Sequence, residues 1–205
     1  MIELFISAVA TFFVIIDPPG CAPIFASLTG GTSNAHRRAM AVRAVFVAAL
    51  ILLFFALVGE AFLRLIGISL DAFRIAGGIM LFLIALEMVF EKRTERRESR
   101  AEEVKTRAPD DISIFPMAIP MIAGPGSIAS AMLLTSRREG PEEIGVVLAA
   151  LAVVLFATLA SLLAAGAIMK LIGAKAEAVI TRLLGVILAA LAAQFVIDGI
   201  RASLG

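Results

Sequence analysis

The segment IIDPPGCAP, residues 15–23, interrupts an apolar run that spans residues 4–34. Proline removes a backbone donor and clashes with the preceding turn, so a continuous helical hydrogen-bond ladder cannot cross this segment. A second apolar run, residues 112–136, contains the interruption PMAIPMIAGPGS at residues 116–127. Each interruption frees carbonyl groups before it and begins a new helix N-terminus after it. In hydrocarbon, such groups are tolerated only when they are buried in protein or line a watery cavity.

The composition indicates that the surrounding solvent is lipid. Of the 205 residues, 60% are hydrophobic, and the mean hydropathy is +1.01. The chain therefore has more apolar side chains than a soluble domain of this length can bury. The net charge is +1 and the charged residues fall in short blocks, which argues against nucleic acid as a partner. The single cysteine, Cys21, excludes an internal disulfide, and the single histidine, His36, argues against a histidine-rich metal or catalytic site. We therefore expect no metal and no cofactor.

Six apolar runs approach the roughly 20 residues that span a bilayer. They predict an all-α membrane protein with six transmembrane helices, of which the first and the fourth are broken. A densely charged segment separates two halves. We predict a first three-helix repeat at 1–91, a charged cytoplasmic loop at 92–111 and a second three-helix repeat at 112–205. The six runs are residues 4–34, 44–63, 75–90, 112–136, 144–169 and 183–200.

The distribution of basic residues predicts the orientation. The loops that follow the first, third and fifth runs hold 13 of the 18 Lys and Arg residues. Cytoplasmic loops carry such an excess, so both termini are expected on the outer side of the membrane.

The second half matches the first in the same order. An offset of 106 residues aligns one proline-glycine pair, one threonine and one basic segment, and an offset of 108 aligns a second basic segment. A unit of three helices is odd, so its second copy must enter the membrane from the other side, which predicts a 3+3 inverted repeat. The alternative is that any two apolar helices look alike. The matched segments are 19–20 with 125–126, Thr29 with Thr135, 64–67 with 170–173, and 74–77 with 182–185.

Paired broken helices at equivalent places in two halves point to a transporter's substrate site. The two new helix N-termini would face each other near the midplane, where their positive dipole ends suit a carboxylate. The residues that we predict to bind substrate are Asp17, Pro19, Gly20, Gly124, Pro125, Gly126, Ser127 and Gln194.

Three of these side chains have alternative roles. A carboxylate within a membrane run is costly and usually functional, but Asp17 before a proline is also a good helix N-cap. Asp17 could also carry a proton. Ser127 either contacts a solute or caps the second half of the fourth helix. Gln194 is expected to be buried, as helix-packing glue or as a solute contact.

Other polar and small residues are interpreted as structural. Glu60 and Arg64 are four residues apart, a spacing that favours an ion pair on one helix face. Arg74 and Arg182 begin the third and sixth helices, where they would snorkel to headgroups or cap loops. Glu87 and Asp198 are expected at the interface. The glycines at 77–78 and 185 permit close helix packing.

The proline-glycine motifs, together with FRIAGG at 73–78, RLLG at 182–185 and QF at 194–195, resemble the MarC family of bacterial inner-membrane proteins. The resemblance covers nearly the whole chain. It implies a six-helix inner-membrane protein that is distantly similar to LysE-type exporters, with neutral amino-acid transport assigned to some members. The family name comes from a multiple-antibiotic-resistance locus, which raises drug efflux as an alternative. Where many relatives place glycine in the turn before the last helix, this chain has GAKA at 173–176.

The leading functional hypothesis is a secondary transporter or exporter of small neutral or zwitterionic solutes such as amino acids. Its partners would be the lipid bilayer, the solute and a coupling ion. An enzyme is not expected, because neither HExxH nor GxSxG occurs in the sequence. A third hypothesis is a non-transporting scaffold or stress-related regulator, in which the breaks only serve packing. The small residues of the fifth and sixth helices could support a homodimer, or could pack within one subunit.

Overall fold

A computed structural model describes residues 1–106, 111–136, 140–167 and 173–204, and every regular element in these ranges is a helix. The first half comprises α1 (Ile2–Ile16), α2 (Pro18–Leu28), α3 (Asn34–Leu65) and α4 (Leu70–Val89). A helix that the sequence did not predict as a separate element, α5 (Lys92–Thr106), follows. The second half comprises η1 (Ser113–Ile122), α6 (Pro125–Ser136), α7 (Pro141–Leu163) and α9 (Gly173–Leu204).

Five helical stretches are long and apolar enough to cross a membrane. These are Ile2–Leu28, Asn34–Leu65, Leu70–Val89, Pro141–Leu163 and Val179–Leu204. The pair η1 and α6 makes a sixth if it is counted as one span, with a bend of 54° between its two parts. The prediction of an all-helical, multi-pass membrane protein is therefore confirmed.

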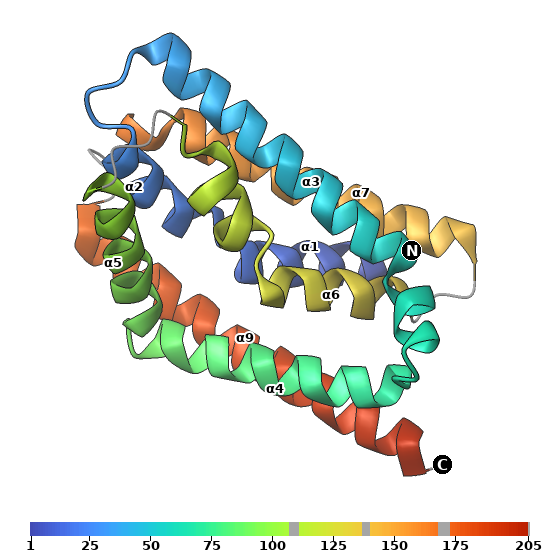
Figure 1. Ribbon diagram of the computed structural model, residues 1–205. Helices are drawn as coiled ribbons and strands as arrows, with labels where there is room; N and C mark the ends of the chain where they lie inside the picture. Colours follow the sequence, from blue (N-terminus) through green and yellow to red (C-terminus); the bar gives the residue numbers. More distant parts are fainter. Residues whose placement is uncertain (107–110, 137–139, 168–172, 205) are drawn as a thin grey trace.

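The helices form three layers (Figure 1). Helices α3 and α7 lie along one side, α4 and α9 lie along the opposite side, and α1 and α6 lie between them. Helices α1 and α2 contact α7, whereas η1 and α6 contact α3. The interrupted segments therefore occupy the centre of the molecule, and the long uninterrupted helices α3, α4, α7 and α9 enclose them.

Glycines bring α4 and α9 close together as an antiparallel pair. A Cβ on Gly78 would lie 2.7 Å from Val196 Cγ2, and one on Gly185 would lie 2.8 Å from Met88 Cβ. Gly199 repeats this arrangement against Ile75, at 2.8 Å. Without side chains at these positions the backbones approach closely, which is how membrane helices gain packing energy. The packing role predicted for the glycines at 78 and 185 is confirmed.

Ion pairs lie near several helix ends. Arg64 donates to Glu60 at 2.6 Å, and Arg74 donates to Asp71 at 3.0 Å within the first turn of α4. Arg182 donates to Glu91 at 2.5 Å and so connects α9 to the end of α4.

Two segments differ in structure from their sequence-based description. Residues 173–176, expected as a turn, form the first turn of α9. The charged segment that follows α4, expected as a solvated loop or helical extension, forms α5, which contacts α2, α4 and η1. Residues 107–110 of that segment, and residues 170–172 of the repeat match, lie outside the described residues.

Candidate functional site

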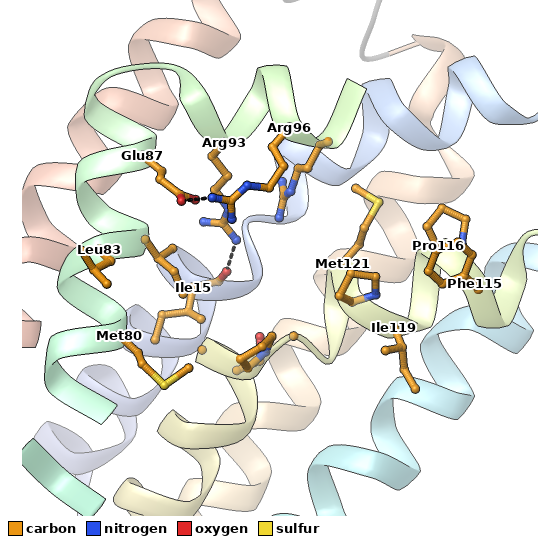
Figure 2. A pocket seen from close by; sticks show the side chains of 17 residues that line it. Ile15, Met80, Leu83, Glu87, Arg93, Arg96, Phe115, Pro116, Ile119 and Met121 are labelled. Atoms are coloured by element: carbon orange, nitrogen blue, oxygen red, sulfur yellow. Dashed lines mark hydrogen bonds and ion pairs between the residues drawn. The ribbon is translucent and has the colours of Figure 1, made fainter. Parts of the chain in front are cut away.

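A cavity of about 670 Å³ lies where α4, α5, η1 and the start of α6 meet (Figure 2). Its size falls within the range of small-molecule sites, roughly 300–1,000 Å³. Apolar side chains of α4 and η1 form most of its wall, and three arginines of α5 enter from one side. The arginines give the cavity a cationic end, and most of the other lining side chains are apolar.

The second interruption forms part of the cavity wall through Gly124, Pro125, Gly126 and Ser127. Here η1 is not a continuous helix: Phe115 and Ile119, the residues before its two prolines, have extended backbone. The hydrogen bond from Ala123 N–H to the Ala118 carbonyl, at 2.9 Å, spans the second of these bends. Helix α6 then begins at Pro125. A Cβ on Gly126 would lie 2.7 Å from Ile84 Cδ1, so glycine lets this N-terminus reach α4. The positive end of the α6 dipole thus borders the cavity.

At the first interruption, an aspartate side chain satisfies the N-terminus of the new helix. Asp17 has a left-handed backbone (φ 58°), ends α1 and precedes Pro18 at the first position of α2. Its Oδ1 accepts a hydrogen bond from Gly20 N–H at 3.1 Å, which is N-capping. A Cβ on residue 20 would lie 2.2 Å from Asp17 Oδ2, so this carboxylate requires glycine there. Asp17 is therefore a helix cap.

The same carboxylate is also half of an ion pair. Arg97 on α5 donates from Nη1 to Asp17 Oδ2 at 2.9 Å, and the two side chains are 10% and 2% exposed. A buried pair of this kind is costly to break, because either partner alone is an unpaired charge away from water. Arg97 lines the cavity and Asp17 lies behind it.

Arg93 satisfies a carbonyl group that the first interruption frees. Pro19 has no N–H to donate to Ile15, and Arg93 Nη2 donates to the Ile15 carbonyl at 2.6 Å instead. Arg93 Nη1 lies 2.9 Å from Met88 Sδ. Burial, followed by the charge of Arg97, lowers the pKa of Arg93 to about 10. This arginine still carries a positive charge at neutral pH, although burial and the neighbouring Arg97 make that charge less favourable than it would be in water.

Arg96 pairs with Glu87 of α4 at the cavity wall (Figure 2). Glu87, expected at the interface, thus belongs to the cavity. The sequence did not identify the three arginines as cavity residues, because their segment was expected to be a solvated loop or a helical extension. One signal could have found them: Arg93, Arg96 and Arg97 are spaced i, i+3, i+4, which puts them on one face of a helix.

The structure brings together only part of the predicted site. The residues from Gly124 to Ser127 line the cavity, and Asp17 adjoins it through Arg97. Pro19 and Gly20 lie in the first turn of α2 and are not among the lining residues.

Gln194 differs from its expectation. Its side chain is exposed rather than buried, and Nε2 donates to Asp198 Oδ1 at 2.7 Å. Helix α9 turns Ala192, Val196 and Gly199 toward α4, which leaves residue 194 on another face. Gln194 does not line the cavity.

No group of three or more His, Cys, Asp or Glu side chains within the described ranges is arranged to hold a metal ion. The polar part of the cavity consists of guanidinium groups, the Glu87 carboxylate, the Ser127 hydroxyl and the backbone of a helix N-terminus. Such an arrangement can bind an oxyanion and orient an apolar group beside it.

An all-helical chain with five or six candidate spans, and with a charged cavity at two helix interruptions, defines a multi-pass integral membrane protein. The chain belongs to the MarC family: residues 2–204 match the family described as "MarC family integral membrane protein".

The chain is similar to three relatives over almost its whole length. A UPF0056 membrane protein of Methanocaldococcus jannaschii is 38% identical over 203 residues, which cover 99% of this chain and 98% of the relative. A UPF0056 membrane protein of Archaeoglobus fulgidus is 35% identical, with coverages of 97% and 93%. The UPF0056 inner membrane protein YhgN of Escherichia coli is 35% identical, with coverages of 96% and 95%. No solved structure matches the chain significantly.

Proposed function

We propose that this protein is a secondary transporter of small neutral or zwitterionic solutes, such as amino acids, and that the cavity between α4, α5, η1 and α6 is its solute site. The observation that carries the proposal is the cavity itself. A scaffold whose interruptions only served packing would fill the space beside them, whereas here about 670 Å³ lies open next to the α6 N-terminus and the Asp17–Arg97 pair.

The arrangement of charges suits a zwitterion. The α5 arginines and the positive end of α6 favour a carboxylate, and Glu87 is the acidic side chain in the cavity wall to which an ammonium group could turn. The walls formed by Leu83, Ile84 and Ile119 would hold an aliphatic side chain. Convergent polar groups at one end of an apolar pocket are typical of small-molecule sites.

A 3+3 inverted repeat is part of the proposal. It is supported by the exchange of contacts between halves: α1 and α2 contact α7, the middle long helix of the second half, and η1 and α6 contact α3, its counterpart in the first. The antiparallel packing of α4 against α9 fits the same relation, because inversion makes the third helix of each unit run in opposite directions. Rocking of one unit against the other around the two interruptions would then alternate access to the cavity.

We further propose that the protein resides in an inner membrane with both termini outside, and that an ion gradient drives transport. The name of the E. coli relative, an inner membrane protein, supports the location, and the excess of basic residues in the odd loops supports the orientation. In this orientation α5 lies on the cytoplasmic side and covers the cavity from there.

The test is counterflow of labelled neutral amino acids in proteoliposomes. Wild type should show saturable exchange, and Gly126→Leu should abolish it, because the new side chain would enter the space beside Ile84. Gly145→Leu on α7 is the matched control, since a Cβ there meets no atom within 4 Å. Absence of exchange for every amino acid with correctly inserted wild type would contradict the proposal and favour the scaffold hypothesis.

A further inference from the structure

At the cationic end of the cavity, Arg93 has no carboxylate hydrogen-bonded to it within the described residues. Three guanidinium groups, from Arg93, Arg96 and Arg97, approach the cavity from one face of α5. Among the described residues, Glu87 pairs with Arg96, and Asp17 pairs with Arg97. Within the described part of the chain, Arg93 has only neutral acceptors, the Ile15 carbonyl and Met88 Sδ.

An unbalanced charge in this position is unfavourable. Carbonyl and thioether groups satisfy some donors of Arg93, but they do not neutralise its charge, and a half-buried ion without a counterion costs free energy until an opposite charge approaches. The lowered pKa of Arg93, caused mainly by burial, points the same way. An anion that entered the cavity would remove this cost and gain a charge-assisted hydrogen bond.

The remainder of the cavity defines what must be attached to that anion. On α4, Met80, Leu83 and Ile84 form one wall, and on η1, Phe115 and Ile119 form another (Figure 2). These side chains offer no charged partner. A ligand that matches both ends has one anionic group and an apolar body.

We propose that the Arg93 end of this cavity binds the single oxyanion group of an amphipathic monoanion, whose apolar body lies between α4 and η1. The inference rests on the proposed function in taking the cavity as the solute site, and it goes beyond that function in adding amphipathic monoanions to the solutes. A zwitterion can bind through its carboxylate, but it brings an ammonium group into an end of the cavity that is already positive. Among solutes of one shape, the monoanion therefore binds more tightly than the zwitterion, and the cation is excluded.

Three compounds that share an isobutyl body separate these charge states: 4-methylpentanoate, leucine and 3-methylbutylamine. Binding to the full-length protein in a neutral detergent is measured by isothermal titration calorimetry. We expect 4-methylpentanoate to bind about tenfold more tightly than leucine, the scale of one charged hydrogen bond, and 3-methylbutylamine not to bind. Equal affinities for the three compounds, or no binding of 4-methylpentanoate, would overturn the inference.

Two substitutions should change the affinity in opposite directions, which misfolding cannot imitate. Arg93→Gln removes the excess charge and should abolish the preference for 4-methylpentanoate. Glu87→Gln releases Arg96 from its partner and should strengthen binding of 4-methylpentanoate several-fold. Arg201→Gln, at an exposed position near the end of α9, is the control and should leave all affinities unchanged. Wild-type affinity in Arg93→Gln would overturn the inference.

The oxyanion could be a free carboxylate or the phosphate of an anionic lipid, and a competition assay separates them. If phosphatidylglycerol, but not phosphatidylcholine, displaces 4-methylpentanoate from wild type, the subsite also accepts a lipid headgroup. If neither lipid displaces it, the ligand is a free solute. Both results support the oxyanion subsite. Leucine counterflow that persists without any preference for the monoanion would overturn this inference and leave the transporter proposal standing.

Discussion

The two interruptions share a proline-glycine pair at the start of a helix, but the helix N-terminus is capped by a side chain in the first and lines a cavity in the second. Residues 17–20, the closed break, and residues 124–127, the open break, both place a proline-glycine pair at the start of a helix. In the closed break, Asp17 caps α2 and pairs with Arg97, and Arg93 donates a hydrogen bond to the Ile15 carbonyl, which the proline leaves without its helical donor. In the open break, the N-terminus of α6 lines a cavity.

One position accounts for much of this difference. The offset of 106 residues that aligns the two proline-glycine pairs places Asp17 opposite Ala123, whose side chain is buried and has no acceptor. A carboxylate neutralises the helix N-terminus in the closed break, whereas in the open break the positive end of α6 keeps its capacity for an external anion. A repeated motif can thus serve structure in one copy and binding in the other.

The largest effect is expected from removing the carboxylate of the closed break. Asp17→Ala should lower the free energy of unfolding by about 3–5 kcal/mol, because it deletes a cap and leaves Arg97 buried without its partner. Thermal and denaturant unfolding in detergent measure this loss. Glu60→Ala, which breaks an ion pair whose side chains are 35% and 78% exposed, should cost less than about 1 kcal/mol.

The double variant Asp17→Ala with Arg97→Gln completes this test. It should recover part of the loss, since no buried charge then remains unpaired. Equal unfolding free energies for wild type and Asp17→Ala would contradict the structural role of the closed break.

A methyl group added to each glycine should separate the two breaks. In Gly20→Ala the new Cβ meets the capping carboxylate at 2.2 Å, and in Gly126→Ala it meets the flexible end of Ile84 at 2.7 Å. Gly20→Ala should therefore cost about 1–3 kcal/mol of stability, and Gly126→Ala should cost less while still reducing flux. Unfolding and counterflow are measured on the same preparations. A larger stability loss in Gly126→Ala would reverse the comparison.

An added carboxylate should make the open break resemble the closed one. Ser127→Asp places a negative charge at the cavity wall near the start of α6, where it would compete with a bound anion and compensate the excess charge of the arginines. The affinity for 4-methylpentanoate should fall about tenfold. Ser127→Asn has nearly the same shape without the charge and is the control. A similar loss of affinity in both variants would assign the effect to size rather than charge.

The smallest effect is expected from the hydroxyl group of the open break. Ser127→Ala removes one candidate hydrogen bond to a solute, which is worth about 0.5–1.5 kcal/mol of binding. The KM of counterflow should rise while the maximal rate stays unchanged. A change in maximal rate alone would argue against a direct contact with the solute.

The sequence predicts the helical, multi-pass class well, because long apolar runs act locally. It does not predict the α5 arginines as cavity residues. Asp17 and Arg97 are 80 positions apart, and nothing local in a dense run of opposite charges indicates that one face turns into the protein.

Gln194 shows the same limit at a single residue. The sequence places it within an apolar run, but only the packing of α9 against α4 decides which face of that helix is covered. The inverted repeat and the outward orientation of both termini stay predictions.

The most direct test compares thiol reactivity at equivalent places in the two breaks. Cys21 in α2 is fully buried, and the offset of 106 residues places it opposite Ser127 in the cavity wall. The measurement is the labelling rate by a membrane-impermeant anionic methanethiosulfonate, in wild type and in the double substitution Cys21→Ala with Ser127→Cys. If the open break is the solute site, labelling occurs at position 127, added leucine slows it, and wild type is unlabelled until it is denatured. Labelling of wild type at the same rate, or no labelling at position 127, would contradict the central claim.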